Sequence, residues 1–206
     1  MFPKLLRPFD YLRIKHDIKE RYDFLFPFSI SAAFTVIFFS LPVTPQIFGS
    51  EGLISNVIST IQILTGFYIA SLAAIATFNK DGLDDVMKGT PPTLSSTIKG
   101  KKANVALTRR KFLCLLFGYL SLTSIMINLM SICAKLVYPS LLALHLSPEL
   151  FFLIKYFSII IYFFVIANLF VTTLIGLYYM SDRIHRYEPK LIKPQRDNES
   201  NDENSA

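Results

Sequence analysis

Charged residues are missing from the middle of each long hydrophobic stretch in this chain. Only 17% of the 206 residues are charged, whereas 52% are hydrophobic. Charges buried inside a membrane mark proton relays, ion paths and voltage sensors, so their absence argues against a proton-coupled transporter. The scarcity of charge also argues against a water-soluble fold, because soluble domains do not carry this much apolar surface with so few charges.

Recognisable catalytic chemistry is also missing. The three histidines, His16, His145 and His185, are scattered along the chain, so no cluster has metal-ligand spacing. The KGKK sequence at 99–102 lacks the glycine scaffold that cradles phosphates, and no G-x-S-x-G elbow occurs. Asp84 fits an i, i+4 pair with Lys88 on a short helix. We therefore expect no enzyme, no metal and no cofactor.

Cysteine is scarce, and its two copies cannot bond to each other. Cys114 and Cys133 fall in one hydrophobic run, where 19 residues of helix hold them about 28 Å apart. A disulfide needs Cα atoms closer than about 7 Å. They are expected to be buried spectators, with a bond from Cys133 to another subunit as the minor alternative.

What the chain does have is hydrophobic runs of membrane-spanning length. About 20 apolar residues cross a hydrocarbon layer of roughly 30 Å, and four such runs occur. The sequence therefore predicts an all-α integral membrane protein with a four-helix transmembrane domain over residues 24–180. The expected spans are 24–41, 53–78, 112–134 and 155–180, with a polar loop at 79–111.

Two flanking segments complete the predicted organisation. Residues 1–23 are predicted to form an amphipathic helix at the headgroup level, since apolar residues recur there at helical spacing. These residues are Tyr11, Ile14, Ile18, Tyr22 and Leu25. Residues 181–206 form a tail whose end, RDNESNDENSA, is predicted to be disordered.

The distribution of basic residues predicts the orientation. Nineteen of the 21 lysines and arginines lie in the N-terminal segment, the 79–111 loop or the tail. The other two, Lys135 and Lys155, flank the connection between the third and fourth spans. Because cytoplasmic loops collect Lys and Arg, both termini and the central loop are expected in the cytoplasm.

Small and weakly polar residues form stripes along the last three spans. One interpretation is a helix-packing or oligomer seam, since such residues let membrane helices approach closely and hydrogen-bond. The alternative places Gln62, Asn128 or Asn168 in an oligomeric pore, although no selectivity-filter signature supports it. The seam residues are Ser59, Gln62, Gly66, Gly118, Ser121, Asn128, Asn168, Thr172 and Gly176.

The basic cluster in the central loop has three interpretations. It can act only as an orientation signal, it can attract anionic lipid, or it can dock an acidic surface of a soluble partner. Residues 90–100, TPPTLSSTIKG, are predicted to be flexible and to order on binding. The candidate partner-binding residues are Lys99, Lys101, Lys102, Arg109, Arg110 and Lys111.

The overall layout resembles a known family. A four-span chain of this length, with a basic central loop after ASLAAIATFNKDGLDDVMKG, resembles KwaA, the membrane subunit of the Kiwa anti-phage defence system. The resemblance implies a homo-oligomer, plausibly a tetramer, in the bacterial inner membrane. It also implies a soluble cytoplasmic DNA-binding effector, KwaB, as partner, so that nucleic acid is contacted only indirectly.

The expected function is therefore a non-catalytic scaffold or sensor that detects infection at the envelope and recruits or activates an effector. The alternative from the residues is an oligomeric pore-forming or ion-conducting membrane protein.

Orientation can be tested by thiol labelling in a variant that lacks Cys114 and Cys133. We expect Ser95→Cys in the central loop to resist a membrane-impermeant reagent until the membrane is opened. A matched Glu51→Cys variant, in the connection between the first two spans, is expected to label in intact spheroplasts. The reverse pattern contradicts the predicted topology.

Overall fold

The computed structural model of the chain describes residues 6–15, 19, 21–43, 45–78, 83–86, 91–98, 101–143 and 147–183. For residues 96–98, 101–102 and 182–183 the backbone alone is described.

Among these residues, four helices are long and apolar enough to cross a membrane. The first is η2 (Arg21–Leu25) continued by α2 (Phe26–Ser40), and the second is α3 (Leu53–Thr77). The third is α4 (Arg109–Ala143), and the fourth is α5 (Pro148–Tyr178) continued by η3 (Tyr179–Arg183). The four predicted spans are confirmed as helices, and the first two match their predicted bounds closely.

The third and fourth helices are longer than predicted. The third span was predicted to end at residue 134, yet α4 continues through Pro139 to Ala143. Proline removes one helical hydrogen bond, and here it does so in the last turns of α4. With 35 residues α4 is about 52 Å long, so it extends well past a hydrocarbon layer of roughly 30 Å.

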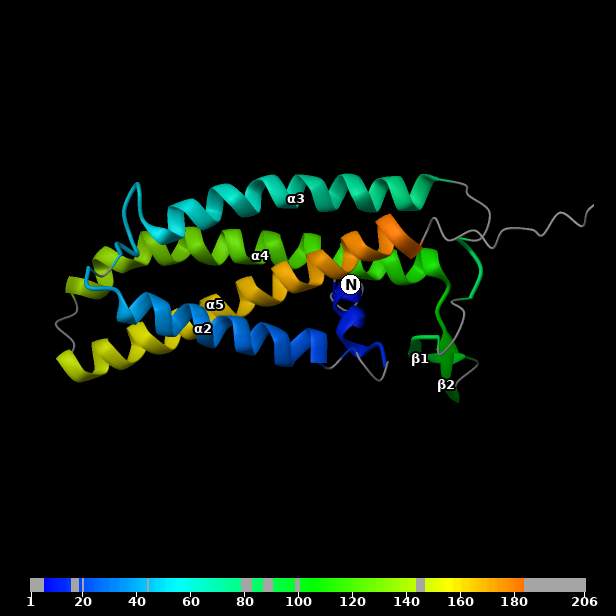
Figure 1. The fold of residues 1–206 in the computed structure, drawn as a ribbon, viewed down its shortest axis with the longest axis horizontal. Coiled ribbons are helices and arrows are strands. Elements are labelled where there is room, and N and C mark those ends of the chain that lie inside the picture. The colour runs from blue at the N-terminus through cyan, green and yellow to red at the C-terminus, as the bar shows by residue number, and fades with distance from the viewer. Residues whose placement is uncertain are drawn as a thin grey trace, which may run out of the picture.

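The helices pack as two pairs, α3 with α4 and α2 with α5, which meet through α4 and α5 (Figure 1). The α5 helix crosses obliquely, beginning beside α2 and ending beside the start of α4 (Figure 1). In the most apolar stretch of α4, 56% of the residues are buried, against 17–22% in the other three helices. The α4 helix is therefore the centre of the fold, and the outer helices expose apolar side chains suited to lipid.

The N-terminal segment does not form the single amphipathic helix expected over residues 1–23. It forms η1 (Arg7–Arg13), becomes extended at Ile14, and then enters η2. Tyr11 and Ile14 are buried in the core that centres on α4, whereas Tyr22 and Leu25 are exposed. Ile18 lies outside the described residues. The apolar side chains of this segment are thus divided between the protein core and the surface.

The central loop folds into a β-hairpin rather than remaining a flexible connection. Strand β1 (Thr93–Ile98) pairs antiparallel with β2 (Lys101–Ala106), from Thr93 opposite Ala106 to Ile98 opposite Lys101. The short helix expected around Asp84 is also absent from the described residues 83–86, which form a bend beside the start of α4. The hairpin, the start of α4 and the end of α5 lie at one end of the bundle (Figure 1), hereafter the hairpin end.

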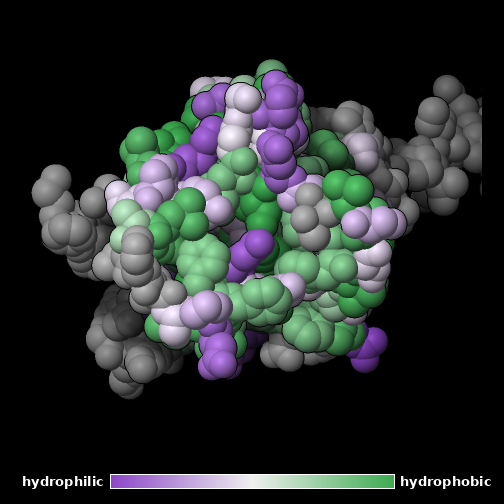
Figure 2. Space-filling model, turned by 90° about the vertical axis from the view of Figure 1, so that its left-hand side faces the viewer, coloured by the Kyte–Doolittle hydropathy of each residue, from purple (hydrophilic) through white to green (hydrophobic). Residues whose placement is uncertain are grey.

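At the opposite end of the bundle, one polar and one aromatic contact join α4 to other described segments. The Lys135 ammonium donates a 2.8 Å hydrogen bond to Ser55 Oγ, joining α4 to the first turn of α3. Phe48 and Tyr138 stack with their ring centroids 3.8 Å apart. Figure 2 looks onto this end, where the surface is hollowed in the middle and mixes hydrophilic with hydrophobic side chains.

Two glycines on different helices give a matched test of this packing. A Cβ at Gly176 would lie 2.9 Å from Leu116 Cδ2 and 3.2 Å from a Phe117 ring carbon, whereas one at Gly66 would meet nothing within 4 Å. Gly176→Val is expected to lower the free energy of unfolding by about 1–3 kcal/mol through overpacking. Gly66→Val carries the same helix propensity change without the clash. Thermal unfolding of dilute protein in detergent checks this, and equal losses would contradict the α4–α5 packing.

Candidate functional site

The described predicted partner-binding residues lie at the hairpin end, but they differ in how exposed they are. Lys99 lies outside the described residues, and Lys101 and Lys102 begin β2, where only their backbone is described. Arg109, Arg110 and Lys111 form the first turn of α4. The first two are half-buried and Lys111 is exposed.

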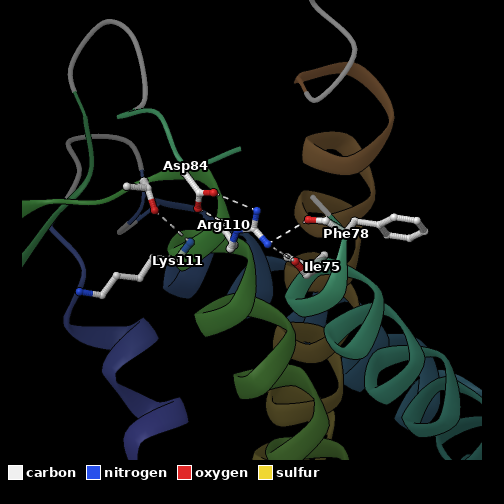
Figure 3. Close-up of polar contacts among 6 residues, drawn as sticks. Ile75, Phe78, Asp84, Arg110 and Lys111 are labelled. Atoms are coloured by element: carbon white, nitrogen blue, oxygen red, sulfur yellow. Dashed lines mark hydrogen bonds and ion pairs between the residues drawn. The ribbon is translucent and has the colours of Figure 1, made fainter. Parts of the chain in front are cut away.

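Arg110 is committed to contacts within the protein (Figure 3). Its Nε and Nη2 donate to the two carboxylate oxygens of Asp84 at 2.8 and 2.9 Å. Its Nη1 donates to the carbonyl oxygens of Phe78 at 2.9 Å and Ile75 at 3.4 Å. The last carbonyls of a helix have no partner within that helix and attract cations. We call this arrangement the Arg110 clamp, and it fastens the 83–86 bend and the start of α4 to the end of α3.

The clamp replaces the predicted ion pair of Asp84 with Lys88, a residue outside the described part of the chain. A bidentate arginine–carboxylate pair is a stronger and more directional contact than a pair on a helix surface. Lys111, by contrast, extends away from the clamp (Figure 3). Its backbone N–H donates to Thr108 Oγ1 at 3.3 Å, and the residue is exposed.

A second group of polar side chains, buried where α2 begins, was not predicted from the sequence. The Asp23 side chain is only 3% exposed and forms an ion pair with Lys19. The phenol of Tyr11 donates to Asp23 Oδ1 at 3.4 Å. A buried carboxylate is costly unless it is paired and hydrogen-bonded, and these two residues satisfy it. The spacing of Lys19 and Asp23, four residues apart, was the available signal in the sequence.

Asn168 joins this carboxylate segment to the other helices. Its Nδ2 donates to the backbone carbonyl of Asp23 at 2.8 Å, and its Oδ1 accepts from the Tyr119 hydroxyl at 2.7 Å. Asp23 lies in η2, Tyr119 in α4 and Asn168 in α5. One amide therefore connects the two helix pairs. We call Tyr11, Lys19, Asp23, Tyr119 and Asn168 the buried junction.

Aromatic contacts hold the N-terminal segment in the junction. The rings of Tyr11 and Tyr119 stack with centroids 5.1 Å apart, and the Lys19 ammonium lies 4.2 Å from the Tyr11 centroid. Burial, with the nearby Asp23 charge as a smaller cause, raises the pKa of Tyr11 far above its usual range. The phenol therefore remains a proton donor, as its hydrogen bond to the carboxylate requires.

The same N-terminal segment also pairs with the hairpin through its backbone. Ile14 is buried, and the next residue, Lys15, pairs with Thr93 at the start of β1. The Lys15 N–H donates to the Thr93 carbonyl at 2.9 Å, and the Thr93 N–H donates back at 3.2 Å. The hairpin is thus attached on one side through the buried junction and on the other through the Arg110 clamp.

The predicted seam residues divide into two sets. Those on α4 and α5 pack inside the protein, where Ser121, Asn168, Thr172 and Gly176 are buried and Gly118 and Asn128 are half-buried. Those on α3 face outward, so that Ser59, Gln62 and Gly66 are exposed.

The seam residues that pack inside the protein also differ in whether their polar atoms have hydrogen-bond partners. Asn168 has hydrogen-bond partners at both ends of its amide. In the part of the chain that the structure describes, Asn128 Oδ1 and Thr172 Oγ1 are buried without one. A buried oxygen without a hydrogen-bond partner lowers the stability of the fold, because its loss of hydration is not compensated.

Within the described ranges, no three His, Cys, Asp or Glu side chains come together in a way that suits a metal ion. Comparison with protein-family models, curated proteins and solved structures finds no match to this chain. The contacts at the hairpin end join the N-terminal segment, the hairpin and the membrane helices to one another. This connection is the feature that bears on function.

Asn168 and Asn128 provide a matched pair for testing the buried junction. Asn168→Leu leaves the Tyr119 hydroxyl and the Asp23 carbonyl unpaired, and each buried orphan costs about 1–3 kcal/mol. We expect a clear loss of thermal stability in detergent. Asn128→Leu removes an oxygen that has no partner and is expected to be neutral or stabilising. Equal losses in the two variants would show that the junction contributes no special stability.

Proposed function

We propose that this protein is a non-catalytic scaffold or sensor in the bacterial inner membrane that recruits or activates a soluble effector. In this proposal it serves an anti-phage defence system, as the resemblance in layout to KwaA suggests, and its effector is a DNA-binding protein such as KwaB. Both termini and the hairpin end face the cytoplasm, which the distribution of lysine and arginine supports.

The observation that carries the proposal is the double attachment of the hairpin. The buried junction connects the hairpin to α2 and α5 through the Lys15–Thr93 pairing, and the Arg110 clamp connects the 83–86 bend and α4 to α3. A rearrangement of one helix pair against the other would displace the two attachments relative to each other. A change within the membrane would thereby alter the surface that a soluble partner meets.

The charge of the hairpin end suits an acidic partner surface. Lys15 and Lys111 are exposed, and Arg109, two residues before Lys111, is half-buried. These cations have no ion pair within the described residues. Complementary charge speeds association and sets orientation more than it adds affinity. Nucleic acid is then held by the partner and not by this chain.

The outward stripe on α3 supports assembly of several copies. Ser59, Gln62 and Gly66 would face hydrocarbon in a single chain, and the Gln62 amide has no hydrogen-bond partner among the described residues. Small residues and side-chain amides favour close association of membrane helices. A homo-oligomer, with a tetramer as the plausible size, would pair these stripes. It would place several hairpin ends side by side for one effector.

Partner recruitment is tested by affinity purification from the native host with identification of captured proteins by mass spectrometry. A variant with Lys99, Lys101, Lys102 and Arg109 changed to Gln is expected to capture roughly tenfold less effector, or ~1.4 kcal/mol weaker binding. Arg110 is left unchanged because it holds the fold together. The matched control changes the three lysines to Arg, which keeps the charge. Equal capture by the Gln variant would place the contact elsewhere.

A further inference from the structure

The end of α5 lies beside the basic start of α4. The ring of Tyr179, in η3, lies 4.9 Å from the ring of Phe112, centroid to centroid. Phe112 directly follows Lys111, and Gly176 packs against Leu116 and Phe117 one to two turns further along α4. The described part of the chain therefore ends close to the start of α4, which carries Arg109, Arg110 and Lys111.

The tail itself contains two segments of opposite charge, both outside the described residues. Residues 184–196 contain four lysines and arginines and one acid, Glu188. Residues 197–206, DNESNDENSA, have four acids and no lysine or arginine. The four acids are Asp197, Glu199, Asp202 and Glu203.

The described acids of the hairpin end leave the surface cationic. Asp10 pairs with Arg13, Asp23 is buried with Lys19, and Asp84 is held by Arg110. The other acids described in the 83–86 bend, the hairpin, the start of α4 and η3 are Asp85 and Asp182. Against these two stand Lys15, Arg109 and Lys111, together with Lys101 and Lys102 of β2.

We propose that residues 197–206 dock on this basic surface and compete with the acidic partner for it. The competition rests on the proposed function, whereas the docking does not. The acidic segment has few residues that favour strand formation, so it binds through charge and not as a third strand of the hairpin. The tail then restrains recruitment until a partner or another trigger displaces it.

The length of the tail suits this contact. Thirteen residues, 184–196, lie between Arg183 and Asp197, and a flexible chain of that length has a root-mean-square span of about 20 Å. A short flexible tether of this kind gives an effective concentration in the millimolar range. Weak surface attraction is enough at such a concentration, although salt screens it.

Docking is measured by electron–electron spin distances in full-length protein in nanodiscs of uncharged lipid. Labels are placed at Ala103→Cys, exposed on β2, and at Ser200→Cys, in a variant that lacks Cys114 and Cys133. At about 0.1 M salt, with a Debye length of about 10 Å, we expect a defined short distance. At about 1 M salt, with a length of about 3 Å, the distribution is expected to broaden and lengthen.

Two tail variants show whether charge is the cause. Changing the four acids to Asn and Gln (D197N, E199Q, D202N, E203Q) is expected to abolish the short distance at low salt. The matched control exchanges Asp for Glu and Glu for Asp at the same positions and is expected to retain it. The same broad distribution in the unchanged and neutralised tails would overturn the proposal. So would loss of the short distance on dilution with unlabelled protein, which would assign the contact to a neighbouring copy.

The competition is tested separately with the captured effector. If the docked tail leaves the surface free about a tenth of the time, partner affinity is about tenfold weaker, so the neutralised tail should raise capture about tenfold. If the unchanged tail gives the short spin distance but no effector is captured with the unchanged or the neutralised tail, the proposed function is contradicted and the docking is not. Effector capture that the tail variants do not change would contradict the competition.

Discussion

Hydrocarbon offers no hydrogen bonds, so each polar group that this chain places inside its helices needs a partner from the chain itself. The constraint is sharpest where α2 begins, because the Asp23 carboxylate and carbonyl are both buried there. Tyr11 and Lys19 satisfy the carboxylate, and Asn168 satisfies the carbonyl. The position of the N-terminal segment, the approach of α5 to α4 and the attachment of the hairpin all depend on this group of contacts.

The second attachment follows from the same physics at a helix end. The last carbonyls of α3 lack partners within the helix, and Arg110 supplies them while it binds Asp84. The α3 helix also carries the outward stripe of Ser59, Gln62 and Gly66. A contact between copies along that stripe would therefore act on the helix that the Arg110 clamp holds. Assembly in the membrane and the arrangement of the hairpin would be linked in this way without any catalytic step.

The four helices were predictable because their hydrophobic runs are long and uninterrupted, and this length alone identifies membrane-spanning segments. The buried junction was not, because Asn168 and Asp23 are 145 residues apart and no local pattern joins them. Asp84 was predicted to form an ion pair with Lys88, four residues along a helix. It instead binds the guanidinium of Arg110, 26 residues away, whose planar shape matches both carboxylate oxygens. In the central loop, the residue types of Thr97 and Ile98 favour a strand and a Lys-Gly sequence is typical of a turn, although polarity suggested a flexible segment.

Hydrogen exchange of the unmodified protein in lipid nanodiscs tests the central claim, that the hairpin is held to both helix pairs. The amides to follow are those of Lys15 and Thr93, which bond to each other's carbonyls, and that of Arg110, which donates to the Leu83 carbonyl at 2.9 Å. The account predicts that all three exchange far more slowly than amides in an unstructured peptide. Exchange of Lys15 and Thr93 at unprotected rates, while α4 stays protected, would mean that the hairpin is not attached to the membrane helices.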